Sequence, residues 1–253
     1  MQTYQWKLVL AYDGSEFHGW QVQPDRVTVQ GELRDALARI TGEEVLPQGS
    51  GRTDAGVHAL GQVASFSLAA PIPEANLARA LNRSLPASIR VLSASRMSSD
   101  FHARHSAVCK TYEYRIFRGE ICPPWQARYV YALNAPLNVE AMQRAAAWVC
   151  GEFDFTAFAA SDPGRSPLDN VRCLHASRWI EEPPLLLYRV QGNGFLHHMV
   201  RNLVGTFLEV GRGNLDEMQI PAILASGSRT QAGPTAPARG LFLVSVDYVI
   251  ARQ

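Results

Sequence analysis

One short polar loop sets an acid and a base between two glycines. Residues 51–59 read Gly-Arg-Thr-Asp-Ala-Gly-Val-His-Ala. Glycine takes positive φ at no steric cost, so Gly51 and Gly56 allow a sharp turn with Asp54 at its tip. A carboxylate there is a candidate nucleophile or base, and Arg52 is a candidate ligand for phosphate or carboxylate. A surface turn whose side chains bond to their own backbone explains the same residues.

Two further stretches carry candidate side chains. On a strand, Lys110, Tyr112 and Tyr114 share one face, a mixture of cation and aromatic rings that is used to neutralise and stack nucleotides. Ordinary sheet packing is the alternative. Arg201 falls one helical turn after His197 and beside an apolar stripe, so its stem can be buried while the guanidinium reaches a cleft. A helix-surface arginine is the alternative there.

The histidines and cysteines do not predict a metal site. His102 and His105 lie three apart and His197 and His198 are adjacent, but neither pair has a third ligand at metal spacing. Phosphate contact or structural hydrogen bonding is the expected role of all four. The four cysteines form no CxxC pair, which predicts reduced thiols. We also find no P-loop or dinucleotide fingerprint, and therefore expect neither metal nor cofactor.

Composition indicates an ordinary globular protein with an unusual cation bias. The chain has 253 residues, 47 % of them hydrophobic, and a net charge of +1. It shows neither a membrane-length apolar run nor a signal peptide, so a cytoplasmic protein is expected. Lys7 and Lys110 are lysines and the other 22 basic residues are arginine, the side chain best shaped for bidentate phosphate contact. Residues 83–118 hold seven basic residues against two acids, which predicts one basic face.

Hydrophobic periodicity predicts strands and helices in a repeated order. In the first half, strands are expected at 5–12, 62–68 and 89–92, a short apolar run at 45–46, and helices at 29–40 and 73–81. In the second half, strands are expected at 109–118, 171–180, 185–190 and 241–250, and helices at 139–149, 196–210 and 216–225. Residues 17–21 read as a loop whose aromatic rings either face a substrate or fold back under cover.

This order predicts an α+β protein made of two similar halves. Each half resembles a split β-α-β unit of the ferredoxin-like or RNA-recognition type, with an antiparallel sheet. We expect an N-terminal domain over 1–98 carrying the Asp54 loop and a C-terminal domain over 99–253 carrying Tyr112 and Arg201. Two such sheets joined side by side would leave a central cleft for a ligand. A polar insertion is expected at 161–170.

Four separated stretches resemble motifs of the TruA family of tRNA pseudouridine synthases. They are residues 51–59, 110–115, 194–205 and 240–244, in the family's order, with a Gly-Trp-Gln element at 19–21. The resemblance covers most of the chain, and nine contiguous residues match a family signature more specifically than a spaced pattern does.

The resemblance implies a homodimeric isomerase that converts uridine to pseudouridine at positions 38, 39 and 40 of the tRNA anticodon arm. Asp54 is then the catalytic residue, and Arg201 keeps it charged and aimed. Tyr112 stacks on the flipped uracil and is a candidate for proton removal, with Leu241, or else Leu243, on the opposite side. Arg52 holds a phosphate or the vacated space. Substrate contacts are also expected from four further cations and histidines, which are His58, Arg104, Lys110 and His197.

Uridine isomerisation adds and removes no atoms, so its stoichiometry requires no ATP, redox cofactor or metal. Attack by Asp54 on C6, attack on C1′ and removal of a C2′ proton all remain open. Two rival functions remain as well. One is a non-enzymatic RNA-binding module with the same fold, and the other is a glycoside hydrolase, which normally needs a second carboxylate as acid.

Overall fold

Two compact units make up the chain, whose computed structural model describes residues 3–160 and 170–249. Unit 1 is Met1–Val108 with Phe242–Gln253, and unit 2 is Cys109–Leu241. The predicted boundary at 98/99 lies ten residues earlier, and the prediction left the last strand with the second half. That strand returns to unit 1 because Phe242 and Leu243 pair in parallel with His58 and Ala59.

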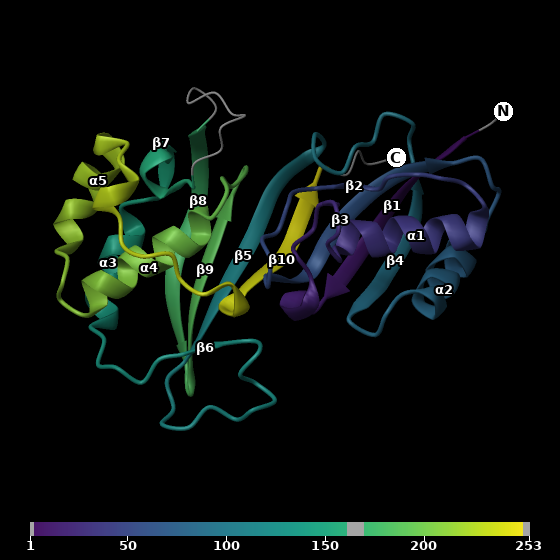
Figure 1. Cartoon of the computed structure of the whole chain (residues 1–253). Coiled ribbons are helices and arrows are strands. Elements are labelled where there is room, and N and C mark those ends of the chain that lie inside the picture. Colours follow the sequence, from purple (N-terminus) through teal and green to yellow (C-terminus); the bar gives the residue numbers. More distant parts are fainter. Residues whose placement is uncertain (1–2, 161–169, 250–253) are drawn as a thin grey trace. The chain divides into compact units, whose positions relative to one another are not determined.

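Unit 1 is an antiparallel sheet with two helices (Figure 1). Its strands run in the order β4-β1-β3, and both β2 and β10 pair with β3. The pairing of β1 with β3 and with β4 is antiparallel. Its elements are β1 (Tyr4–Tyr12), α1 (Val29–Thr41), β2 (Gln48–Gly49), β3 (His58–Leu68), α2 (Glu74–Ser84), β4 (Ile89–Met97) and β10 (Leu241–Tyr248), of which Leu241 belongs to unit 2.

Every second residue of β1 is buried from Trp6 onward, and capping residues mark both ends of α1. Alternate residues of β1 are buried, from Trp6 to Tyr12, as the sequence predicted. The Thr28 hydroxyl accepts from the Gly31 amide at the start of α1, and Gly42 closes the helix with a φ of 72°. The strand β3 begins at His58, four residues before its predicted start, because its first residues pair with β10.

Unit 2 is a second antiparallel sheet in the order β5-β9-β8-β7, with the short β6 in parallel with β5. The helices α3 and α4 pack on each other, and α3 packs on β8 (Figure 1). Its elements are β5 (Ala107–Phe117), β6 (Tyr131–Ala132), α3 (Val139–Ala147), β7 (Gly151–Asp154), β8 (Val171–Glu182), β9 (Leu185–Gly192), α4 (Met199–Gly211) and α5 (Ile220–Ser226).

The core of unit 2 joins β8, β9 and α4 through aromatic rings. Tyr188 lies 5.1 Å from Trp179 and 5.4 Å from Phe207, measured between ring centroids. All three rings are buried. Asn138 caps the start of α3, since its side chain accepts from the Ala141 amide. These antiparallel sheets with packed helices confirm the predicted α+β class.

Several boundaries differ from the prediction for local reasons. The helix α4 begins at Met199 rather than at 196, because His198 takes left-handed backbone angles with φ 61°. The helix predicted at 216–225 is a 3-10 turn, Glu217–Gln219, followed by α5 with a proline in its first turn. The strands β6 and β7 were not predicted, being two and four residues long. The predicted insertion at 161–170 lies, apart from Asn170, outside the described residues.

Among the described residues, we find no helix with the length and apolar character needed to cross a membrane.

Candidate active-site residues

The Asp54 loop of unit 1 is anchored at Thr53. The Thr53 side chain is buried, and its hydroxyl lies 2.8 Å from the Tyr12 hydroxyl. The Thr53 carbonyl accepts from the Trp20 amide at 3.0 Å. Asp54 itself is partly exposed, so the loop holds its backbone in place without burying the residue.

The second half of the loop turns at Gly56. The φ of Gly56 is 77°, as predicted, whereas the described backbone gives Gly51 no positive φ. The Val57 amide donates to the Asp54 carbonyl at 3.1 Å, which closes the turn directly after the acid. The Gln62 side chain donates to the Gly51 carbonyl at 3.1 Å and accepts from the Ser50 hydroxyl at 2.7 Å. A buried side chain therefore fixes the start of the loop, and a backbone turn closes its end.

Residues 14–20 clasp the loop from one side. A Cβ on Gly19 would lie 2.5 Å from the Thr53 carbonyl oxygen, and one on Gly14 would lie 2.0 Å from that of Val57. Only glycine allows such close approach of two backbones. Phe17 and Trp20 are 5 % and 2 % exposed. The aromatic rings of this segment are thus folded under cover, and the substrate-facing alternative is wrong for these two side chains.

His58 is built into the support of the loop. Its side chain is 1 % exposed, and its Nδ1 lies 3.0 Å from the Gly14 amide and 3.2 Å from an oxygen of Asp13. Its ring stacks on Phe242 with centroids 4.7 Å apart. This burial favours a positioning role over the direct substrate contact that we expected from the sequence.

Arg52 and Arg104 are the exposed cations among the predicted site residues of unit 1. Arg104 sits in a tight turn in which the His102 Nδ1 accepts from the Arg104 amide at 3.1 Å. The Tyr248 hydroxyl donates to the Ala103 carbonyl at 2.7 Å and so joins this turn to the end of β10 within unit 1. The segment that the prediction placed in the second domain therefore belongs to the first.

In unit 2, the two tyrosines of the strand β5 have different surroundings. Tyr112 is 7 % exposed and meets Phe195 edge-on, with ring centroids 4.9 Å apart. Tyr114 is fully buried, and its hydroxyl donates to the Pro237 carbonyl at 2.8 Å. Burial raises the pKa of Tyr114 far above its ordinary value. Tyr114 is thus a structural residue, and Tyr112 remains the candidate for contact with a base.

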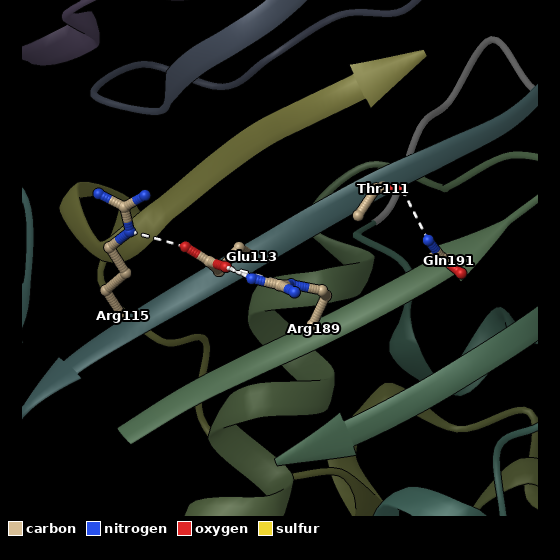
Figure 2. Close-up of polar contacts among 5 residues, drawn as sticks. All are labelled: Thr111, Glu113, Arg115, Arg189 and Gln191. Atoms are coloured by element: carbon tan, nitrogen blue, oxygen red, sulfur yellow. Dashed lines mark hydrogen bonds and ion pairs between the residues drawn. The ribbon is translucent and has the colours of Figure 1, made fainter. Parts of the chain in front are cut away.

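Neighbours of these tyrosines on the other face of the sheet form an ion-pair cluster. Figure 2 shows the Glu113 carboxylate between the guanidinium groups of Arg115 and Arg189. Arg115 Nε lies 2.9 Å from one carboxylate oxygen, and Arg189 Nε lies 3.2 Å from the other. Burial would raise the pKa of Glu113, but hydrogen bonds from both arginines outweigh it and hold that pKa below its ordinary value.

This cluster fixes the register of β5 against β9. Glu113 is directly opposite Arg189, and the Gln191 side chain donates to the Thr111 hydroxyl at 3.1 Å in the same ladder (Figure 2). A shift of one residue would move every side chain to the other face. The pairing therefore keeps Tyr112 and Tyr114 on the face away from the cluster.

Arg201 lies in the first turn of α4, which His198 begins with positive φ. Its Nε donates to the Ala236 carbonyl at 2.7 Å, and its own carbonyl accepts from the Ala236 amide at 3.1 Å. These two bonds with one residue fix the backbone of Arg201 and the orientation of its guanidinium. The helix-surface alternative does not describe a residue held in this way.

The remaining predicted residues of unit 2 have varied surroundings. His197 is exposed, and its ring lies 4.0 Å from that of His198. Lys110 is partly exposed on β5 opposite Gly192. Leu241 is 5 % exposed at the start of β10, and the alternative Leu243 is 1 % exposed in unit 1.

Comparison with known proteins decides the family. A profile described as tRNA pseudouridine synthase matches residues 8–106 and 145–249. The chain belongs to the tRNA pseudouridine synthase family. Among similar proteins are three named tRNA pseudouridine synthase A. The protein of Solibacter usitatus is 51 % identical to this chain, that of Moorella thermoacetica 50 % and that of Brevibacillus brevis 43 %. Each alignment covers 96 % of this chain and 98 % of the similar protein.

Family membership makes the chain an isomerase of uridine in tRNA and confirms the resemblance to TruA. It also decides against the two rivals, the non-enzymatic RNA-binding module and the glycoside hydrolase. A chain in a crystal structure of a Cbf5-Nop10-Gar1 complex is similar with a TM-score of 0.32 and 13 % identity, covering 80 % of this chain and 54 % of that one. A likeness of that size carries no information about the site.

Sequence reasoning missed the residues that hold the candidates in place. Tyr12 and Gln62 support the Asp54 loop, and Asn202, the residue after Arg201 in α4, accepts a hydrogen bond from Arg229. Asn202 had a signal, because a polar residue falls among the buried positions of an apolar helix. Arg229, in a loop without periodicity, had none.

Proposed function

We propose that the protein converts uridine to pseudouridine at positions 38, 39 and 40 of the tRNA anticodon stem-loop, with Asp54 as nucleophile or base and without a cofactor. The observation that carries the proposal is the construction of the Asp54 loop in a member of this family. The backbone around the acid is held by hydrogen bonds, at the hydroxyl and carbonyl of Thr53 and in the turn where the Asp54 carbonyl accepts from the Val57 amide, while Asp54 stays partly exposed.

The roles of the other residues follow from the motif resemblance. We propose that Arg201 keeps the Asp54 carboxylate charged and oriented. An arginine at about 4 Å from a carboxylate stabilises it by about 4 kcal/mol at an effective dielectric of 20. Tyr112, with its hydroxyl-bearing ring on β5, stacks on the uracil, and Leu241 packs on the opposite side. Because a base inside a stem cannot be reached, the nucleotide is flipped out, and Arg52 occupies the space or binds a phosphate.

The cationic residues Arg104, Lys110 and His197 are proposed to contact the tRNA backbone. We further propose a homodimer working in the cytoplasm, where tRNA is modified. Both units are proposed to be variants of the split β-α-β unit around a central cleft. In support, unit 1 has the element order β-α-β-β-α-β and an antiparallel sheet ordered β4-β1-β3 with β2 on β3.

The test is purified protein with an unmodified tRNA transcript, in the presence of a chelator, assayed for pseudouridine. We expect product from the wild type, none from Asp54→Asn, and wild-type rates from the control Asp35→Asn, a residue of α1 whose side chain is 49 % exposed. Transcripts with cytidine at 38, 39 or 40 should lose the product at that position alone. Activity that survives in Asp54→Asn, or disappears with chelator, refutes the corresponding part of the proposal.

Arg201→Ala separates catalysis from binding. Loss of the charge that holds Asp54 should abolish turnover, while the Kd for tRNA stays within about threefold of the wild type. Arg212→Ala, which removes a cation at the other end of the same helix, is the control and should retain turnover. If tRNA binding collapses in Arg201→Ala, the residue is a phosphate ligand instead.

A further inference from the structure

A polar network in unit 2 begins at the residue that follows Arg201 in α4. Its centre is Asn202, whose side chain is 0 % exposed although it is an amide on an apolar helix. The Asn202 Nδ2 donates to the Phe158 carbonyl at 2.7 Å. Its Oδ1 accepts from the Thr235 hydroxyl at 2.7 Å and from Arg229 Nη2 at 3.1 Å. The amide therefore joins α4 to two segments that are far away in the sequence.

Arg229 organises the segment that follows α5. Its Nη1 donates to the carbonyls of Ala232 and Gly233, at 3.3 and 2.9 Å, and its Nη2 also donates to the Thr235 hydroxyl at 3.1 Å. One guanidinium thus fixes residues 229–235 as a compact loop. Figure 1 shows this segment, in yellow, running past α4 on its way from α5 to β10.

The backbone of this loop is in direct contact with α4. A Cβ on Gly205 would lie 1.6 Å from the Pro234 carbonyl oxygen, so no other residue fits at this position without movement. The Thr206 hydroxyl accepts from the Gly233 amide at 2.9 Å and donates to the Asn202 carbonyl at 2.7 Å. The contact is close, polar and repeated along one face of the helix.

The same loop ends on the residues that hold Arg201. Ala236, the next residue after Thr235, exchanges two hydrogen bonds with Arg201. Pro237 accepts from the Tyr114 hydroxyl. A Cβ on Gly240 would lie 2.7 Å from the Tyr114 ring, so the chain that leads to Leu241 is also seated there. The position of the Ala236 carbonyl, and with it the Arg201 guanidinium, depends on how residues 229–235 are folded.

We propose that Asn202, Arg229 and Thr235 are positioning residues for Arg201. They act by holding the Ala236 carbonyl at the point where it receives the Arg201 Nε, and they touch no reacting atom themselves. This inference rests on the proposed role of Arg201 in turnover. A network that served the fold alone would need no connection to Ala236, and its loss would change stability without changing the rate of the folded enzyme.

Thr235→Val is the informative variant, because valine keeps the shape of threonine and removes both of its hydrogen bonds in the network. Displacement of a catalytic group by 1 Å costs up to about 100-fold in rate. We expect kcat with saturating tRNA to fall by about 10- to 100-fold, while KM and the Kd for tRNA stay within about threefold. Thr235→Ser restores the hydroxyl and should recover most of the lost kcat.

Ser177→Ala is the matched control. Ser177 is buried in the same unit, and its hydroxyl lies 2.7 Å from that of Tyr188. The control should lower Tm as Thr235→Val does and leave kcat unchanged. Arg229→Lys serves as a second variant should Thr235→Val not fold, since lysine keeps the charge but cannot make the four bonds. It is expected to lower kcat in the same way.

Unchanged kcat in Thr235→Val, or a rise in KM with kcat intact, overturns the inference and leaves the proposed function standing. Absence of product from the wild type overturns the proposed function, and the inference with it. Full turnover by Arg201→Ala removes only the role of Arg201 and this inference, because the Asp54 test is independent of both.

Discussion

The cluster around Glu113 gives a sharp prediction for Glu113→Gln. Glutamine keeps the size of the side chain and removes the charge that Arg115 and Arg189 share (Figure 2). Glu113 is 5 % exposed, so the two guanidinium groups would lose a partner that water cannot replace in full. The variant should fold, because the β5–β9 ladder remains, but with lower stability.

The magnitude follows from burial. Breaking a fully buried pair by removing one partner costs about 3–5 kcal/mol. Arg115 and Arg189 have 28 % and 35 % of their side chains exposed, so solvent screening reduces that figure to about 2 kcal/mol. For a protein of this size, a loss of about 2 kcal/mol lowers Tm by about 4–8 °C.

The pH dependence separates this ion-pair effect from a packing effect. The pKa of Glu113 is below its ordinary value of 4.5 in the folded protein, so the folded state binds the proton less tightly than the unfolded state. The stabilisation is therefore complete above that ordinary value and is lost as pH falls through the folded pKa. Urea unfolding of wild type and Glu113→Gln should show a constant difference from pH 7 to pH 5.5 and a shrinking one below pH 4.5.

The exposed residue Glu182 supplies the control. Glu182→Gln should change the free energy of unfolding by less than about 0.5 kcal/mol at any of these pH values. A difference between wild type and Glu113→Gln that is equally large at pH 7 and pH 3 would refute the electrostatic explanation. So would an unchanged Tm at pH 7.

Two other variants test the support of the Asp54 loop. Gly19→Ala should lower both Tm and kcat, because its Cβ meets the Thr53 carbonyl and its φ is 85°. Gly42 has a similar φ of 72° in open space, so Gly42→Ala should lower the free energy of unfolding by about 1 kcal/mol without affecting kcat. Equal losses of kcat in Gly19→Ala and Gly42→Ala would contradict a role for the contact between Gly19 and Thr53 in holding the loop. Tyr12→Phe removes the bond to the Thr53 hydroxyl and should cost about 1–2 kcal/mol in urea unfolding. Burial raises the pKa of Tyr12 to about 12, so this loss should be the same at pH 6 and pH 9, and a pH-dependent loss would speak against it.

Local patterns predicted most of the elements because their causes are local. Alternating apolar and polar residues around Trp6, Leu8 and Leu10 predicted β1, and helical periodicity predicted α1 and α3, whose ends lie at the caps Gly42 and Asn138. Boundaries set by distant partners were missed. The strand β4 continues to Met97 because it pairs with β1 along its length, and no pattern within 89–97 indicates that.

The same division holds for the candidate site. The nonapeptide around Asp54 indicated the family and the acid, because a contiguous motif is legible without any contact. It did not show that His58, inside that motif, is buried against Phe242, nearly two hundred residues away. The motif around Tyr112 indicated that tyrosine, but not that the neighbouring Tyr114 is buried with its hydroxyl bonded to the Pro237 carbonyl.

The amino-acid sequence by itself determined the family and the α+β class and supplied Asp54 as the candidate acid, since each of these rests on residue types and their spacing along the chain. Only the tertiary structure decided which side chains hold the acid loop and Arg201 in place. Those partners, such as Tyr12 with Thr53 and Asn202 with Arg229, are separated by 41 and 27 positions in the chain. Hydrogen bonds between them form only after the sheet and helices have packed, so no local pattern encodes them.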